Sequence, residues 1–288
     1  MAENTADPLV DVAWLQVHLD APDIRIVDAT WFMPGDLRDA RLMHAGQRIP
    51  GAVFFDLDEI SDTASPLPHM LPSAEKFASR MRKLGIGDGA RIVVYDAHGI
   101  FSAARVWWMF RAMGADDVVV LDGGLPAWIA DGGAIDDGPP TKPSERHFTA
   151  RLRRDLVRDL AEMRALVARG GAGILDARPA PRFSGAESEP RPGLARGHMP
   201  GAANLPFASL LDADKRMKSR EALNDIFASL PIDPRQAPVA TCGSGVTAGV
   251  VALALARTGR WDTAVYDGSW AEWGARDDTP IVKEARGE

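Results

Sequence analysis

The sequence predicts an α/β protein made of two tandem domains, each with a mostly parallel central sheet flanked by helices. Short apolar runs typical of buried strands alternate with segments of helical spacing. The order of these elements then repeats in the second half of the chain. A length of 288 residues suits two domains that each bury a core of their own.

The first half of the chain alternates between the two kinds of element. We expect helices over 9–19, 73–85, 101–113 and 125–130, and strands over 24–28, 52–55, 91–95 and 118–121. Ser73 is a favourable N-cap for the second of these helices, and Gly85 is a natural end for it. The charged stretch 31–50 is expected to be irregular, and the Pro/Gly/Ser-rich stretch up to Pro72 to be an ordered surface loop. Alternation of this kind predicts a parallel sheet covered on both faces.

A linker separates the two predicted domains. The segment 136–146 has no periodicity and contains three prolines among many polar residues. We therefore expect an N-terminal domain at 8–135, a linker at 136–154 and a C-terminal domain at 155–283.

Three short motifs of the first half return in the second half, about 145 to 150 residues later. The pairs are Ile26–Thr30 with Ile174–Arg178, Arg48–Ala52 with His198–Ala202, and Leu121–Leu125 with Tyr266–Trp270. Because the spacing is nearly constant and the period is that of a whole domain, we infer a duplicated domain.

Composition and charge exclude several classes of function. The chain has 33 Lys and Arg against 40 Asp and Glu, a net charge of −7 that gives no support for general binding of nucleic acid or anionic membranes. Charged residues interrupt every apolar run, so no membrane span is expected. One cysteine cannot form an internal disulfide, and residues 1–7 lack the pattern of a signal peptide. We expect a reducing, cytoplasmic setting.

The single cysteine lies where a strand, a glycine loop and a helix meet. Cys242 follows the apolar run Val239–Thr241, Gly243 and Gly245 punctuate the loop, and a long apolar helical pattern begins at Ala248. Ligands usually bind at the carboxyl ends of parallel strands. Inward backbone N–H groups and the helix dipole favour a thiolate there. We expect a nucleophile at this position instead of an inert, buried side chain.

The first half lacks this thiol. The repeat aligns Cys242 with Asp96, followed by a loop that we expect to be one residue longer. One domain is therefore expected to be catalytic and the other supporting.

Two classes of enzyme place a cysteine in such a loop. A Cys-x5-Arg phosphatase needs an arginine at the sixth position after the cysteine, where its planar fork clamps the phosphoryl group. That position is Ala248, which disfavours a phosphatase. Backbone donors alone can still hold a cysteine persulfide.

The loop Cys242–Ala248 resembles the active-site loop of the 3-mercaptopyruvate sulfurtransferases, a family of the rhodanese superfamily. Matches at Ser65–Pro72, Val106–Met109 and Tyr266–Trp270 extend the resemblance over nearly the whole chain. It implies two rhodanese-like domains, the second of which transfers sulfane sulfur from 3-mercaptopyruvate to a thiol or to cyanide. A persulfide on Cys242 carries the sulfur, pyruvate is released, and neither a metal nor an organic cofactor is required.

The resemblance also implies residue roles around Cys242. Arg182 and Arg191 match the two family arginines that hold the carboxylate and carbonyl of mercaptopyruvate, a task suited to fork-shaped donors. The alternative is that they pair with Glu187 or Glu189 at the surface, for at most about 1 kcal/mol. The backbone amides of the loop are expected to hold the terminal sulfur, at Gly243, Gly245, Val246 and Thr247.

The source of the proton for the leaving pyruvate is less directly indicated. Ser244 is suited to donate it, although a small residue in a tight turn is the alternative. Family proposals assemble a serine, histidine and aspartate relay, with the histidine from a His-Ile-Pro-Gly segment in the first domain. Arg48 occupies that position, so the relay is not assigned and Arg48 is left to assist the anionic substrate electrostatically.

Two alternatives stay open, a thiosulfate sulfurtransferase and a non-catalytic persulfide carrier. Rhodaneses that use thiosulfate typically carry basic residues after the cysteine, where this chain has Gly243 and Ser244. Without a second cysteine the persulfide cannot resolve internally. We therefore expect an external acceptor, either a thioredoxin-like protein or a small thiol.

Overall fold

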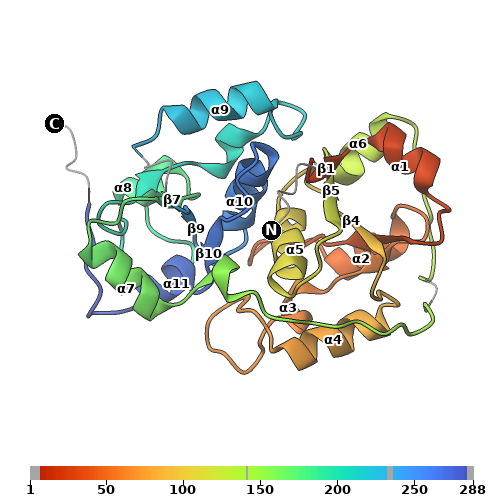
Figure 1. Ribbon diagram of the computed structural model, residues 1–288, viewed down its shortest axis with the longest axis horizontal. Helices are drawn as coiled ribbons and strands as arrows, with labels where there is room; N and C mark the ends of the chain where they lie inside the picture. Colours follow the sequence, from red (N-terminus) through yellow and green to blue (C-terminus); the bar gives the residue numbers. More distant parts are fainter. Residues whose placement is uncertain (1–6, 141, 232–235, 284–288) are drawn as a thin grey trace.

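The computed structural model describes residues 7–140, 142–231 and 236–283. Thr141 of the predicted linker and residues 1–6, part of the stretch that we expect not to be a signal peptide, lie outside this description. Two five-stranded sheets, one in each half of the chain, form two lobes that lie side by side (Figure 1). All strand pairs within these sheets are parallel, which confirms the predicted α/β class. The domain bounds 8–135, 136–154 and 155–283 stay a prediction.

The N-terminal sheet has the strand order β1-β5-β4-β2-β3. Its strands are β1 (Leu9–Val10), β2 (Ile24–Asp28), β3 (Val53–Phe54), β4 (Arg91–Tyr95) and β5 (Val118–Leu121). The helices of this half are α1 (Val12–His18), α2 (Ala40–Gly46), α3 (Leu57–Ile60), α4 (Ala74–Lys83), α5 (Ser102–Ala112) and α6 (Gly124–Ala130).

The C-terminal sheet has the order β6-β10-β9-β7-β8, which is the same topology. Its strands are β6 (Val157–Arg158), β7 (Ile174–Asp176), β8 (Ala203–Asn204), β9 (Val239–Thr241) and β10 (Ala264–Tyr266). The helices are α7 (Leu160–Ala168), α8 (Ala180–Ser184), α9 (Arg220–Ala228), α10 (Ala248–Arg257) and α11 (Ser269–Trp273), with 3-10 turns η1 (Arg154–Leu156) and η2 (Phe207–Leu210).

The strand registers relate the two domains residue by residue. Asp28 of β2 pairs with Tyr95, and Asp176 of β7 pairs with Thr241. Asp96 directly follows Tyr95, and Cys242 directly follows Thr241. The predicted equivalence of Asp96 and Cys242 is therefore confirmed. The following helices, α5 and α10, both begin six residues later, which means that the loops are of equal length. The expected extra residue after Asp96 is therefore wrong.

Periodicity did not indicate the shortest elements. The helix expected over 9–19 is α1 from Val12 to His18, and Leu9–Val10 before it form strand β1. The stretch 31–50, expected to be irregular, contains α2, whose N-cap Asp39 accepts hydrogen bonds from the backbone of the first turn. The stretch before Pro72 likewise contains α3, capped by Asp56. Both have at most seven residues and bury only one or two side chains, which is too little for an amphipathic pattern.

The two domains pack through helices α5 and α10, which lie next to each other in the middle of the molecule (Figure 1). Every residue of α5 is buried. A Cβ on Gly249 of α10 would come within 2.7 Å of the backbone nitrogen of Arg105 in α5, so glycine permits this close approach. One hydrophobic core cluster consequently includes residues of both domains.

The linker lies along the N-terminal domain. Gly138 donates to the carbonyl of Ala45 in α2, and Asp88 donates to the carbonyl of His147. Further on, Arg151 donates to the carbonyl of Met113 at the end of α5. Among the described residues, no helix is both long and apolar enough to cross a bilayer.

Candidate active site

Cys242 is the first residue after β9, at the carboxyl end of the C-terminal sheet, and is 2% exposed. Its carbonyl accepts a hydrogen bond from Trp270 N–H at 2.9 Å, and its own N–H donates to Ser269 Oγ at 3.4 Å. Gly245 has φ of +80°, and a Cβ there would lie 2.9 Å from the guanidinium of Arg105. The loop is thus held between α11 and the neighbouring domain, with no room for a side chain at Gly245.

The equivalent loop of the N-terminal domain binds a side chain of its own. The carboxylate of Asp96 accepts hydrogen bonds from the backbone N–H groups of His98, Phe101 and Ala103, each at 2.8 Å. Within the described residues, the N–H groups from Gly243 to Thr247 have no protein acceptor. The C-terminal loop therefore presents free donors where its counterpart binds its own carboxylate.

A serine, a histidine and an aspartate meet beside this loop. Ser244 Oγ lies 3.2 Å from Nδ1 of His69, and Nε2 of His69 lies 3.2 Å from Oδ1 of Asp58. The other oxygen of Asp58 accepts from the indole N–H of Trp31 at 3.1 Å. The hydrogen bond with His69 is the main reason why the pKa of Asp58 is lowered. Ser244 and His69 are buried, whereas Asp58 is at the surface.

Sequence reasoning missed His69 and Asp58. It looked for the histidine in the segment at Arg48, but His69 belongs to Ser65–Pro72, a segment that already carried part of the resemblance. The segment Ser65–Pro72 reaches the C-terminal domain, where the N–H of Leu71 donates to Asp267 at 2.7 Å. The available signal for His69 was its place within Ser65–Pro72, because this segment matches the family and contains a histidine between prolines.

Arg48 does not reach the site, and the expectation of an electrostatic role there is wrong. Its guanidinium donates to the carbonyls of His44, Ala45 and Gly138, the last at 2.7 Å. Arg48 precedes β3, at the amino end of the N-terminal sheet, whereas Cys242 lies at a carboxyl end. Its contacts join α2 to the linker.

Arg182 lies directly against the cysteine loop. Its Nη2 is 2.9 Å from the position that a Cβ on Gly243 would take. The alternative pairing with Glu189 is also present, through Nε at 3.3 Å and through Nη2. The Glu189 side chain is only 2% exposed and also binds Arg178 at 2.7 Å, whereas the Arg182 side chain is 17% exposed. The pairing is therefore partly buried and is not a fully exposed surface contact. Glu189 thereby fixes Arg182 beside the loop.

Arg191 lies close enough to these residues for their charges to act on it. It is half-buried, and the charged groups that act on it are Cys242, Arg182, Glu189 and Asp58. Burial lowers the pKa of Arg191, and the negative charge of a Cys242 thiolate acts in the opposite direction. The structure therefore brings the sequence-predicted residues Cys242, Ser244, Arg182 and Arg191 together.

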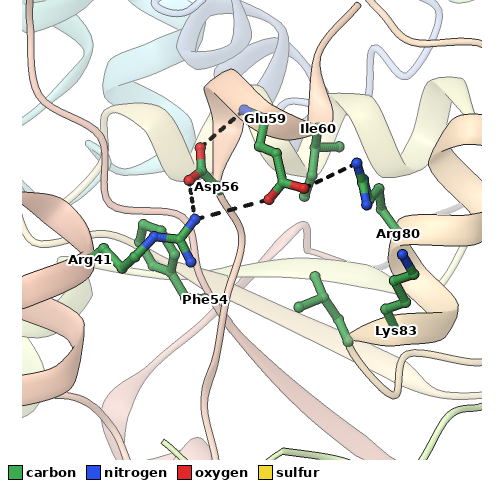
Figure 2. A pocket seen from close by; sticks show the side chains of 8 residues that line it. Arg41, Phe54, Asp56, Glu59, Ile60, Arg80 and Lys83 are labelled. Carbon is green, nitrogen blue, oxygen red and sulfur yellow. Dashed lines mark hydrogen bonds and ion pairs between the residues drawn. The ribbon is translucent and has the colours of Figure 1, made fainter.

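A separate hollow of about 120 Å³ lies in the N-terminal domain (Figure 2). Figure 2 shows Arg41 and Arg80 on opposite sides of Asp56 and Glu59, and ion pairs join these cations to the carboxylates. Its lining comes from the N-terminal domain alone. Among the described residues, no group of three or more His, Cys, Asp or Glu side chains is placed to hold a metal ion, in this hollow or elsewhere.

Comparison with known proteins places this geometry in a family. The model of the rhodanese-like domain matches residues 11–131 and 159–276. A 3-mercaptopyruvate sulfurtransferase of Escherichia coli (strain K12) is 42% identical over 94% of this chain and 96% of that protein. A thiosulfate sulfurtransferase of Gallus gallus is 40% identical over 94% of this chain and 95% of that protein.

Among solved structures, SseA from Escherichia coli, a 3-mercaptopyruvate enzyme with the rhodanese fold, superimposes with a TM-score of 0.84. The two chains are 39% identical, and the match covers 93% of this chain and all of SseA. The fold, the duplicated topology and the sequence matches agree, and the chain belongs to the rhodanese family as a tandem-domain protein.

Proposed function

We infer that this chain is a 3-mercaptopyruvate sulfurtransferase in which Cys242 carries the transferred sulfur. The names of its relatives support the activity. The observation that carries the residue assignment is the convergence of Arg182, Arg191 and the Ser244–His69–Asp58 chain on the loop after Cys242. The site thus combines a thiol, two cations for an oxo acid and a path for a proton.

In the first step, the Cys242 thiolate attacks the sulfur of 3-mercaptopyruvate. A sulfur–sulfur bond forms and the carbon–sulfur bond breaks, with its electron pair left on the carbon of the pyruvate enolate. The thiol proton of the substrate stays on the transferred sulfur, so Cys242 becomes a perthiol. Arg182 and Arg191 bind the carboxylate and carbonyl oxygens and stabilise the charge of the enolate.

Protonation of the enolate carbon completes the release of pyruvate. Ser244 donates this proton and recovers one from His69 Nδ1, because these atoms lie 3.2 Å apart. Asp58 stabilises the positive charge of the imidazolium through its contact at 3.2 Å. The lowered pKa of Asp58 keeps this carboxylate ionised at neutral pH, as the role requires.

The perthiol on Cys242 then releases its proton to water, and the free amides from Gly243 to Thr247 hold the terminal sulfur of the resulting persulfide anion. Support comes from the other domain, in which backbone N–H groups of the equivalent loop and helix start donate to the carboxyl group of Asp96. Gly243, Gly245, Val246 and Thr247 contribute backbone only, which fits their small or apolar side chains.

In the second step, an acceptor thiolate attacks the outer sulfur and regenerates the Cys242 thiolate. Since the chain has one cysteine, the acceptor is external, a thioredoxin-like dithiol or a small thiol. A dithiol acceptor then expels sulfide as it closes its own disulfide. A reducing cytoplasm is the compartment that we propose, because it maintains such thiols.

Thiosulfate is the second candidate donor, and a thiosulfate sulfurtransferase is among the relatives at 40% identity. Two arginines also suit its sulfonate oxygens. Its leaving group, sulfite, is a stable anion that needs no proton, so the Ser244–His69–Asp58 chain favours mercaptopyruvate. A non-catalytic carrier would need neither this chain of residues nor the arginines.

The test is to supply each donor with a thiol acceptor and to follow pyruvate, sulfite and sulfide, with Cys242→Ser as the control. We expect mercaptopyruvate to give the higher kcat/KM and the variant to form no persulfide. Equal or faster turnover of thiosulfate would overturn the assignment of the donor. Undiminished activity of Cys242→Ser would overturn the mechanism.

A further inference from the structure

One buried cation joins the two domains next to the proposed site. Arg105 of α5, which is fully buried, donates through Nη2 to Oδ1 of Asp267 at 2.7 Å and to the carbonyl of His69. Its Nη1 lies 3.4 Å from the carbonyl of Gly245 in the cysteine loop. A single guanidinium therefore contacts the residue that carries the imidazole, the cysteine loop and the loop after β10.

Asp267 holds the same segment from the other side. Its second oxygen accepts the N–H of Leu71 at 2.7 Å, two residues after His69. His69 itself has φ of 59°, in the left-handed region that residues other than glycine rarely occupy. Such a conformation persists when neighbouring contacts over-determine it, and Arg105 and Asp267 supply contacts on both sides of it.

We propose that the Arg105–Asp267 pair is a positioning device that sets the backbone of His69 and so aims its Nδ1 at Ser244. The hydrogen bonds that the two side chains make outside the pair are with the backbone of His69, Leu71 and Gly245. This inference rests on the proposed role of His69 in proton delivery. It adds that the second domain, through Asp267, controls how the first domain presents its histidine.

The pseudo-symmetric position offers an internal comparison. Asp122, which follows β5 as Asp267 follows β10, accepts the N–H of Met217 at 2.8 Å across the same domain interface. Lys215, two residues before Met217, also has a left-handed backbone, with φ of 61°. Each domain thus has an aspartate that accepts the N–H found two residues after a left-handed residue of the other domain. The buried arginine belongs to the Asp267 copy, since the residue of α10 that corresponds to Arg105 is Val251, and that copy presents a histidine to a serine beside the cysteine.

The experiment compares Asp267→Asn with Asp122→Asn in the full-length protein. We measure kcat and KM for pyruvate release from mercaptopyruvate, and the rate at which iodoacetamide alkylates Cys242. We expect Asp267→Asn to lower kcat at least tenfold with KM and alkylation changed less than twofold. In Asp122→Asn all three quantities should stay within twofold of the wild type.

A purely structural role of Asp267 predicts a different outcome, in which kcat, KM and alkylation change together because the loop and the arginines are disturbed as well. That result, or an unchanged kcat, would overturn the proposal. Should Asp267→Asn fail to fold, Asp267→Glu keeps a charge beside Arg105 but displaces the carboxylate by one methylene. The Asp267→Glu variant must then show the same tenfold loss of kcat with KM changed less than twofold.

His69→Asn and Ser244→Ala separate this inference from the proposed function. If neither variant lowers kcat, the proton path itself is wrong. If both do and the Asp267 variants do not, only the positioning role of the pair is wrong.

Discussion

The carboxylate of Asp96 stands in the N-terminal domain where the thiol of Cys242 stands in the C-terminal domain. Both residues follow the central strand of their sheet, and both precede a loop of five residues and a buried helix. The side chain of Asp96 satisfies three backbone N–H groups of its own loop. Duplication has thus left two loops of equal length. The first donates to its own side chain, and the N–H groups of the second have no acceptor among the described residues.

The first prediction concerns the protonation of Asp96. Burial raises the pKa of this carboxyl group, and its hydrogen bonds with backbone N–H groups only partly oppose the effect. A folded-state pKa above the unfolded value stabilises the protein at pH below the unfolded pKa, and the contribution is lost as pH rises through the folded pKa. The free energy of unfolding of the wild type relative to Asp96→Asn should therefore be higher at pH 4 than at pH 7.

Urea unfolding of both proteins at the two pH values measures this difference. Asp137→Asn, at an exposed position outside the loop, is the control and should show no such change. Parallel pH dependences of the wild type and Asp96→Asn would contradict the prediction.

The second prediction separates the two donors. Loss of a general acid typically costs about 10²-fold or more in rate, so Ser244→Ala and Asp58→Asn should lower pyruvate release from mercaptopyruvate by about that factor. Turnover of thiosulfate should fall much less, because sulfite leaves without a proton. Steady-state rates with both donors give the ratio. The control His147→Asn changes an exposed histidine and should leave the ratio of the two rates unchanged. Equal losses with both donors in Ser244→Ala would argue against proton delivery by Ser244.

The duplication, the longer strands of the first sheet and the loop after Cys242 could be predicted because they depend on short runs of sequence. The two-residue strand β1 could not, since Leu9 and Val10 continue the apolar pattern from which a helix over 9–19 was expected. A strand is an apolar run of a few residues, and a repeat needs only motifs at constant spacing. The short helix α2 could not be predicted, since His44 is its only buried residue.

The proton path could not be predicted for a different reason. Ser244 and His69 are 175 residues apart and meet only because the segment around His69 crosses to the other domain. No local pattern encodes such a contact. Arg48 was assigned to the site because a motif matched in sequence, although that motif lies at the opposite end of its sheet.

The third prediction concerns Arg191, a half-buried residue on which the charge of Cys242 acts. A hydrogen bond to a charged group contributes about 1.5–3 kcal/mol, which corresponds to about a tenfold to hundredfold change in affinity. Arg191→Ala should raise the KM for mercaptopyruvate by that factor. Arg196→Ala, at an exposed arginine five positions further on, should change KM less than twofold. A KM that changes equally in both variants would mean that charge alone, and not the position of Arg191, binds the substrate.

The last prediction concerns Glu189, the buried carboxylate that Arg178 and Arg182 share. Removing the charge leaves two guanidinium groups partly unpaired in a buried place, and breaking a buried ion pair of this kind costs about 3–5 kcal/mol. Glu189→Gln should lower the free energy of unfolding by about 3 kcal/mol and also raise the KM for mercaptopyruvate, because Arg182 loses its anchor beside Gly243. Glu187→Gln, at an exposed glutamate two residues away, should change stability by less than about 0.5 kcal/mol. Urea denaturation and steady-state kinetics measure the two effects. If Glu189→Gln loses no stability, the pairing contributes no more than a surface contact does, and Arg182 must be held by other means.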